Sequence, residues 1–74
     1  MNLDSLLVDN NLAQQYLDKN ESKTNDLLLE ITRTKGRLED YTIIFDELTE
    51  TFNIDGHRYS DFNYVLAYIL KKRE

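Results

Sequence analysis

Cysteine, proline and tryptophan are absent from this sequence, and glycine occurs only twice, at Gly36 and Gly56. Without cysteine the chain can form neither a disulfide nor a cysteine-based zinc site, and a single histidine, His57, is too few for a histidine-rich one. We therefore expect no metal and no cofactor. A unit of 74 residues has a small core, so association with other chains is the favoured route to stability.

Positive charge is also scarce: nine Lys and Arg face fourteen Asp and Glu, for a formal net charge of −5. Nucleic-acid binding needs clustered Lys and Arg, so we expect no nucleic-acid partner. No apolar run approaches the roughly 18 to 20 residues that cross a bilayer, and the first residues lack the pattern of a signal peptide. The sequence therefore predicts a cytoplasmic protein with no membrane partner.

The spacing of apolar residues predicts one long helix. From Leu27 to Phe52 they recur, with Thr34 among them, in alternating steps of four and three, which is the heptad pattern of a coiled coil. Because no proline interrupts it, the register extends back to residue 3. We predict an all-α fold, a single unit over 1–74, with a heptad helix at 3–52. The predicted oligomer seam consists of Leu17, Leu27, Ile31, Leu38, Tyr41, Phe45, Leu48 and Phe52.

A polar stretch at 20–26 leaves two architectures open. If the helix continues through it, Asn20 and Thr24 become buried polar layers that set the register. If the stretch is a loop, the chain folds back as a helical hairpin or a three-helix bundle. Apolar residues beside the seam widen the stripe and favour a trimer over a dimer. Gly36 falls on the outside of the helix, where it costs about 1 kcal/mol but disturbs no packing.

A turn at 53–59 and a second helix at 60–73 follow. Ser60 is the expected N-cap, Tyr59 is placed to contact Tyr64, and three basic residues load the last turn. A helix this short needs a packing partner. Its predicted packing or partner face, with the residues leading into it, consists of Ile54, Tyr59, Phe62, Tyr64, Val65, Leu66, Tyr68 and Ile69.

No residue pattern indicates catalysis. His57 lies near Asp55 and Asp61, but a turn residue, a solvated histidine and a helix-start charge explain the three. The serines lie near no histidine in the sequence, and no glycine-rich phosphate loop exists. We therefore expect no catalytic residues and no enzyme.

The chain resembles the small acidic coiled-coil chaperones that help tail-fibre proteins of T-even-type bacteriophages to trimerise. The resemblance rests on the seam from Leu27 to Phe52, the stretch 52–62 with its Asp-Gly turn, and Val65 and Ile69 behind it. It implies a homo-oligomeric assembly factor that binds protein clients, in the host cytoplasm if the gene is a phage gene. The alternative function is a small acidic inhibitor or regulator of one protein target, acting by nucleic-acid mimicry if its acidic surface is regular enough.

Overall fold

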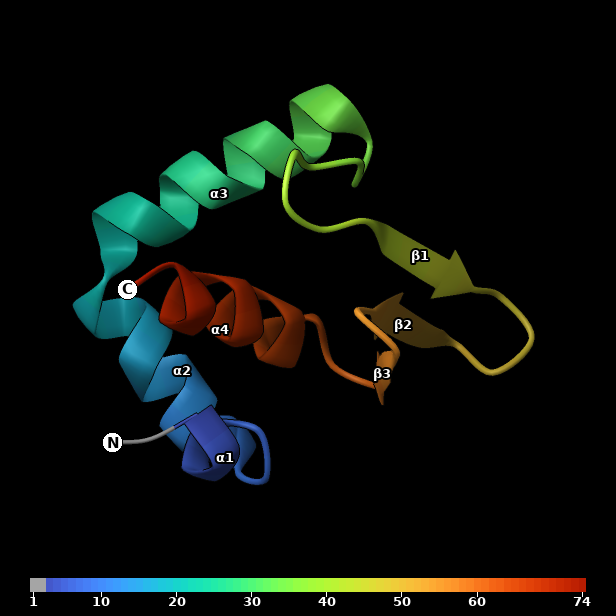
Figure 1. The fold of residues 1–74 in the computed structure, drawn as a ribbon. Coiled ribbons are helices and arrows are strands. Elements are labelled where there is room, and N and C mark those ends of the chain that lie inside the picture. Colours follow the sequence, from blue (N-terminus) through green and yellow to red (C-terminus); the bar gives the residue numbers. More distant parts are fainter. Residues whose placement is uncertain (1–2) are drawn as a thin grey trace.

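The structure, a computed structural model, describes residues 3–74 and shows a mixed helix and sheet fold, so the predicted all-α coiled coil is wrong (Figure 1). Residues 1 and 2, part of the predicted unit 1–74, lie outside the described range. Helices come first, a small sheet follows, and a last helix packs against both. The elements in residues 3–74 are α1 (Leu3–Leu6), α2 (Asn10–Lys19), α3 (Glu21–Thr34), β1 (Ile43–Asp46), β2 (Thr51–Ile54), β3 (His57–Tyr59) and α4 (Phe62–Arg73).

The predicted helix over 3–52 fails most clearly after Thr34, where α3 ends. Lys35 and Gly36 have positive φ angles of 57° and 84°, and the amide of Gly36 donates to the carbonyl of Ile31 at 3.0 Å. Left-handed residues with this backward bond satisfy the last carbonyls of a helix and end it. Gly36 is therefore part of a helix stop and not, as predicted, an outward-facing residue inside a helix.

Residues 43–59, predicted as the end of the heptad helix and a turn, contain an antiparallel sheet in the order β1-β2-β3. Phe45 lies opposite Phe52 in the first strand pair, and Phe52 lies opposite Tyr59 in the second. Asp55 and Gly56 join β2 to β3 with φ angles of 50° and 81°. Two positive φ angles fit the twist of a tight hairpin turn, so the turn predicted at 53–59 shrinks to these two residues.

The polar stretch at 20–26 is almost entirely helical, and the break between α2 and α3 lies at Asn20 alone. The side-chain amide of Asn20 donates to the carbonyl of Tyr16 at 2.8 Å. The hydroxyl of Thr24 lies 2.9 Å from the carbonyl of Asn20 and 3.2 Å from that of Leu17. Both side chains therefore bond to main chain at a bend, and the oligomer layers predicted for them do not form.

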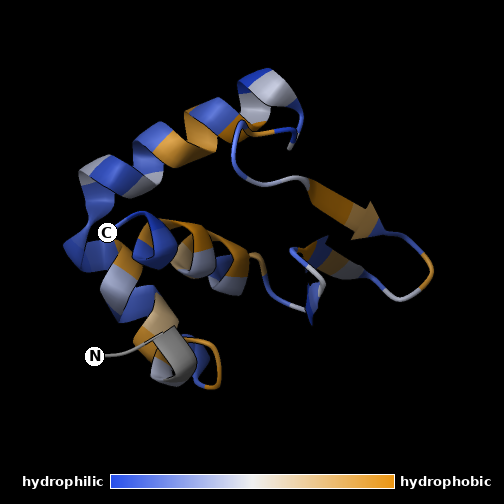
Figure 2. Cartoon of the chain, viewed as in Figure 1, coloured by the Kyte–Doolittle hydropathy of each residue, from blue (hydrophilic) through white to orange (hydrophobic). Residues whose placement is uncertain are grey.

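Helix α4 lies at the centre of the molecule and contacts α1, α2, α3, β2 and β3 (Figures 1 and 2). Its N-cap is Asp61, one residue after the predicted Ser60, and the Asp61 carboxylate accepts from the amide of Asn63 at 2.8 Å. The consecutive residues 65–70 are all buried. A helix that is apolar on every side belongs inside a core, so α4 is a core helix, whereas the sequence predicted an amphipathic helix with one packing face.

The residues of the predicted seam are scattered over the fold. Leu17, Leu27 and Leu38 are buried in the core around α4. Ile31, Tyr41 and Phe52 are partly buried and pack against that core. Phe45 and Leu48 are exposed, on β1 and on the loop that follows it. The first two groups belong to the core of a single chain, and of the predicted seam only Phe45 and Leu48 are exposed.

Candidate functional site

The polar groups considered for catalysis are occupied by structural contacts. The carboxylate of Asp55 accepts from the hydroxyl of Tyr68 at 2.7 Å, and Asp61 caps α4. The ring of exposed His57 lies against Tyr59 and Tyr68, with centroid distances of 6.1 and 5.5 Å. In residues 3–74, no three His, Cys, Asp or Glu side chains gather closely enough to hold a metal ion. We therefore look for a binding surface.

The predicted face of the last helix is largely interior. Val65, Leu66, Tyr68 and Ile69 on α4 are buried, as is Ile54 at the end of β2. Tyr59, Phe62 and Tyr64 are partly buried at its margin, and the expected contact between Tyr59 and Tyr64 is present, with ring centroids 5.9 Å apart. These residues join the sheet to α4, so they leave no apolar face on α4 for a partner.

Tyr68 links α4 to the turn between β2 and β3, and its hydroxyl gives a testable pH dependence. Its hydrogen bond to Asp55, together with burial and nearby charge, raises the pKa of Tyr68 to about 12. Because this exceeds the pKa of an unfolded tyrosine, about 10, the protonated group stabilises the fold fully below that pH and loses its contribution as the pH rises towards 12.

We expect the free energy of unfolding, measured with urea, to fall between about pH 10 and pH 12. Tyr68→Phe should be less stable at neutral pH, because the bond to Asp55 is lost, but should show a shallower alkaline decline. Burial also raises the pKa of Tyr59, so part of the decline should remain in the variant. Identical slopes for the two proteins would show that Tyr68 does not carry the effect.

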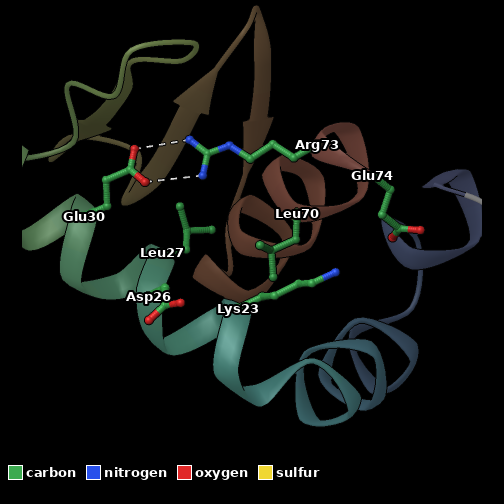
Figure 3. Close-up of a pocket in the computed structure, with 7 residues that line it drawn as sticks. All are labelled: Lys23, Asp26, Leu27, Glu30, Leu70, Arg73 and Glu74. Atoms are coloured by element: carbon green, nitrogen blue, oxygen red, sulfur yellow. Dashed lines mark hydrogen bonds and ion pairs between the residues drawn. The ribbon is translucent and has the colours of Figure 1, made fainter.

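A cavity of about 270 Å³ lies between α3 and the end of α4 (Figure 3). Arg73 reaches across it: its guanidinium makes two bonds of 2.9 Å to Asp40 and two of 3.2 and 3.4 Å to Glu30. The guanidinium holds the pKa of Asp40 below its usual value. Arg73 is already bound by two carboxylates. Its contacts join the end of α4 to α3 and to the connection that follows α3, so we assign this cavity a structural role. Its lining is Lys23, Asp26, Leu27, Glu30, Leu70, Arg73 and Glu74.

A group of exposed apolar side chains lies on the β1–β2 hairpin. Ile44 is 59% exposed, Phe45 50% and Leu48 96%; we call these three residues the hairpin patch. Figure 2 shows β1 in the hydrophobic colour and a second hydrophobic stretch in the loop, with a hydrophilic segment between them. Large apolar side chains grouped on a surface are typical of binding sites, whereas single ones need no explanation.

The hairpin holds its exposed leucine in an ordered loop. The carboxylate of Asp46 accepts from the amides of Leu48 and Thr49 at 3.0 and 3.4 Å, and these bonds lower the pKa of Asp46. Phe45 packs on Phe52, and Phe52 on Phe62 of α4, with ring centroids 5.1 and 5.0 Å apart. The patch is therefore tied to the core helix, and a partner that binds it need not order a flexible loop.

The patch lies within the most acidic part of the chain. Residues 38–57, here called the acidic segment, contain six Asp or Glu and no Lys or Arg. The other residues contain eight Asp or Glu and nine Lys or Arg, so all of the net negative charge comes from the acidic segment. An apolar patch with an acidic surround is complementary to an apolar surface with a basic surround.

The prediction from sequence included Phe45 and Leu48 as residues of the oligomer seam, and it did not include Ile44. Two signals point to the hairpin: the run Thr42, Ile43, Ile44, Phe45 is rich in strand-forming residues, and Asp55-Gly56 favours a tight hairpin turn. Both were overridden by the regular heptad spacing, which predicts helix through the same residues.

Comparison of the chain with protein-family models, curated proteins and solved structures finds no match. Within residues 3–74, none of the helices is both long enough and apolar enough to cross a membrane. The hairpin patch and the acidic segment therefore supply the basis for a functional proposal.

Proposed function

We propose that this chain is a small non-enzymatic regulator that binds one protein target through the hairpin patch. The observation that carries the proposal is the exposure of Ile44, Phe45 and Leu48 on a hairpin whose loop is held by Asp46. Burying an aliphatic or aromatic side chain contributes about 1.5–3 kcal/mol, so three of them supply a useful anchor for a partner.

The target we propose presents apolar side chains flanked by Lys and Arg. Three carboxylates of the acidic segment, those of Asp46, Glu47 and Glu50, lie on the hairpin that carries the patch, and complementary charge speeds association and selects against acidic partners. The same charge acts against self-association through this surface, because two copies would bring two acidic segments together. We therefore propose a monomeric chain.

The alternative of a trimeric assembly factor for phage tail fibres loses its structural support. That expectation rested on a heptad helix through residues 27–52, and this stretch contains a helix stop, two strands and a loop. The acidic inhibitor or regulator, which needs only a binding surface and an acidic surround, fits the hairpin.

The proposal is tested by capture with paired variants. The wild-type chain, a double variant Phe45→Ser and Leu48→Ser, and a control Leu29→Ser are used as baits in an extract of the source organism. Leu29 is 61% exposed on α3, so the control removes a comparable exposed apolar side chain elsewhere. We expect a target retained by the wild type and the control but depleted about tenfold or more with the double variant, since two buried anchors are lost.

Two measurements make the capture interpretable. Thermal melts should show that all three proteins are folded at the temperature of the capture, with the double variant melting lower because Phe45 is half-buried against Phe52. Raising the salt concentration should weaken retention of the target, because opposite charges surround the patch. If every retained protein is bound equally by the wild type and the double variant, the hairpin patch is not the binding site.

A further inference from the structure

Strand β1 lies at an edge of the sheet and has β2 on one side only. The amide of Ile43 donates to the carbonyl of Gly36 at 2.8 Å, so it points away from β2. Amide and carbonyl groups alternate in direction along an antiparallel strand. The amide and carbonyl of Phe45, two residues further on, therefore also point to the free edge, beyond the part covered by Gly36.

The hairpin patch includes side chains on both faces of this edge. Phe45 lies on the face that packs towards α4, because its cross-strand neighbour Phe52 contacts Phe62. Ile44 lies on the opposite face, where its neighbour is Asn53. A rigid pocket that approaches one face covers only one of the two. An added strand has side chains on both faces and covers both.

The edge formed by β1 has four residues and ends in Asp46, but it lacks lysine and proline, two residues that often prevent strand pairing. Folded proteins protect such edges with lysine, proline, bulges or very short strands, and the acidic segment contains no lysine and no proline. The opposite edge, β3, spans only three residues, His57–Tyr59. Edge β1 is therefore the better template for a partner strand. The carboxylates of the acidic segment repel a second copy of this chain and attract a basic partner.

We infer that the target adds a short extended segment, in which basic residues alternate with β-branched ones, to the free edge of β1 by main-chain hydrogen bonds to Phe45. The inference rests on the proposed function and specifies how the patch is used. Apolar side chains of the segment cover Phe45 and Ile44, and its Lys or Arg side chains reach the carboxylates of the acidic segment.

The test uses a synthetic peptide, acetyl-Lys-Val-Lys-Val-Lys-Val-amide, and the same peptide with its four central amides N-methylated. The second peptide keeps the charges and side chains but has lost the four central main-chain donors. Binding to the isotope-labelled chain is followed by amide NMR spectra and by hydrogen exchange. We expect the parent peptide to bind about tenfold more tightly, since N-methylation removes the donor for the Phe45 carbonyl and its methyl groups crowd the strand edge, and to slow exchange of the Phe45 amide.

A matched pair of chain variants gives a second readout. Ile44→Lys places a positive charge at the edge and should weaken binding of the parent peptide about tenfold or more, because it repels the peptide and removes an apolar contact. Leu29→Lys adds the same charge on α3 and should leave that binding within about twofold, since charges far from the edge are screened. Both proteins should melt as the wild type does.

Equal binding of the two peptides, or binding without protection of the Phe45 amide, would show that charge alone attracts the peptide and would overturn strand addition. Absence of parent-peptide binding at millimolar concentration would overturn it as well. Either result leaves the hairpin-dependent capture of a protein intact, because that experiment removes Phe45 and Leu48 side chains and does not depend on main-chain pairing. The proposed function would be contradicted by a different result, namely equal capture of every retained protein by the wild type and by the double variant.

Discussion

Replacing Ile69 by alanine is expected to lower the free energy of unfolding by about 3 kcal/mol, within the range of 2–5 kcal/mol for buried Ile to Ala changes. Ile69 has no exposed surface and lies among the buried residues of α4. Because α4 contacts three helices and two strands, the cavity left behind is enclosed on all sides, and surrounding segments have little freedom to collapse into it.

The consequence for a chain of this size is severe. At about 0.05–0.15 kcal/mol per residue a small domain has little stability in reserve, so a loss of about 3 kcal/mol removes much of it. We expect the melting temperature to fall by more than about 10 °C, since 1 kcal/mol corresponds to about 4–8 °C at this length. Urea unfolding followed by circular dichroism, at fixed pH and salt, measures the loss directly.

Leu48→Ala is the matched control, because it also removes aliphatic carbons but at a side chain that is 96% exposed. We expect its stability to lie within about 0.5 kcal/mol of the wild type. A coiled coil through residues 27–52 predicts the opposite, since Leu48 would then be a core residue of the seam. A large loss in Leu48→Ala, or a small one in Ile69→Ala, would contradict the fold described above.

Replacing Gly36 by alanine is expected to destabilise the protein by about 2 kcal/mol, through strain at a left-handed position and a close contact. Gly36 has a φ angle of 84°, and an added Cβ would lie 3.0 Å from the carbonyl oxygen of Ile43. That oxygen belongs to the main chain at the start of β1, so it cannot rotate away as a flexible side chain would. The substitution should separate the end of α3 from the first strand.

Gly56→Ala separates the two causes. Gly56 has a similar φ angle of 81°, but a Cβ there would have no heavy atom within 4 Å. It should therefore cost only the conformational penalty, about 1 kcal/mol. Urea unfolding of both variants gives the difference, which reports the contact between Gly36 and Ile43. Equal losses would mean that this contact is relieved without cost.

Local signals predicted the last helix well, and long-range packing explains what they missed. Asp61, the basic residues at the end and the contact between Tyr59 and Tyr64 are consequences of short-range chemistry, so helix 60–73 was located to within two residues at its start. Its central position depends on which elements surround it. In the sequence, the sign of this was the unbroken run of apolar and aromatic residues at 65–70, all of which are buried in the structure.

The heptad pattern was misleading because apolar residues recur at similar spacing for unrelated reasons. Phe45 and Phe52 are seven residues apart because they face one another across a hairpin with a four-residue loop. Leu38 lies in the connection after α3 and is buried in the core, and Leu48 lies in the hairpin loop. One geometry, the helix, explains all of these spacings at once, and only the residues at 35–36 and 42–45 contradict it locally.

For the candidate site, the sequence singled out Phe45 and Leu48 as apolar residues of interest but did not predict that they are exposed. The acidic character of residues 38–57 is visible in the chain, yet its meaning changes once those residues form a hairpin beside the core helix. A uniform helix distributes carboxylates around a rod, whereas a hairpin gathers them around one edge. Which apolar residues remain exposed follows from the position of α4, and that position is a property of the whole fold.

The central helix is also the last of the described elements in chain order. A ribosome makes the three earlier helices and the sheet before it makes their common packing partner. These segments have no shared core to assemble around during that interval, so we expect the nascent chain to stay open until residues 62–73 leave the exit tunnel. During this interval β1 is not yet packed against the rest of the fold. We expect repulsion between the acidic segments of neighbouring nascent chains to oppose their aggregation through this strand.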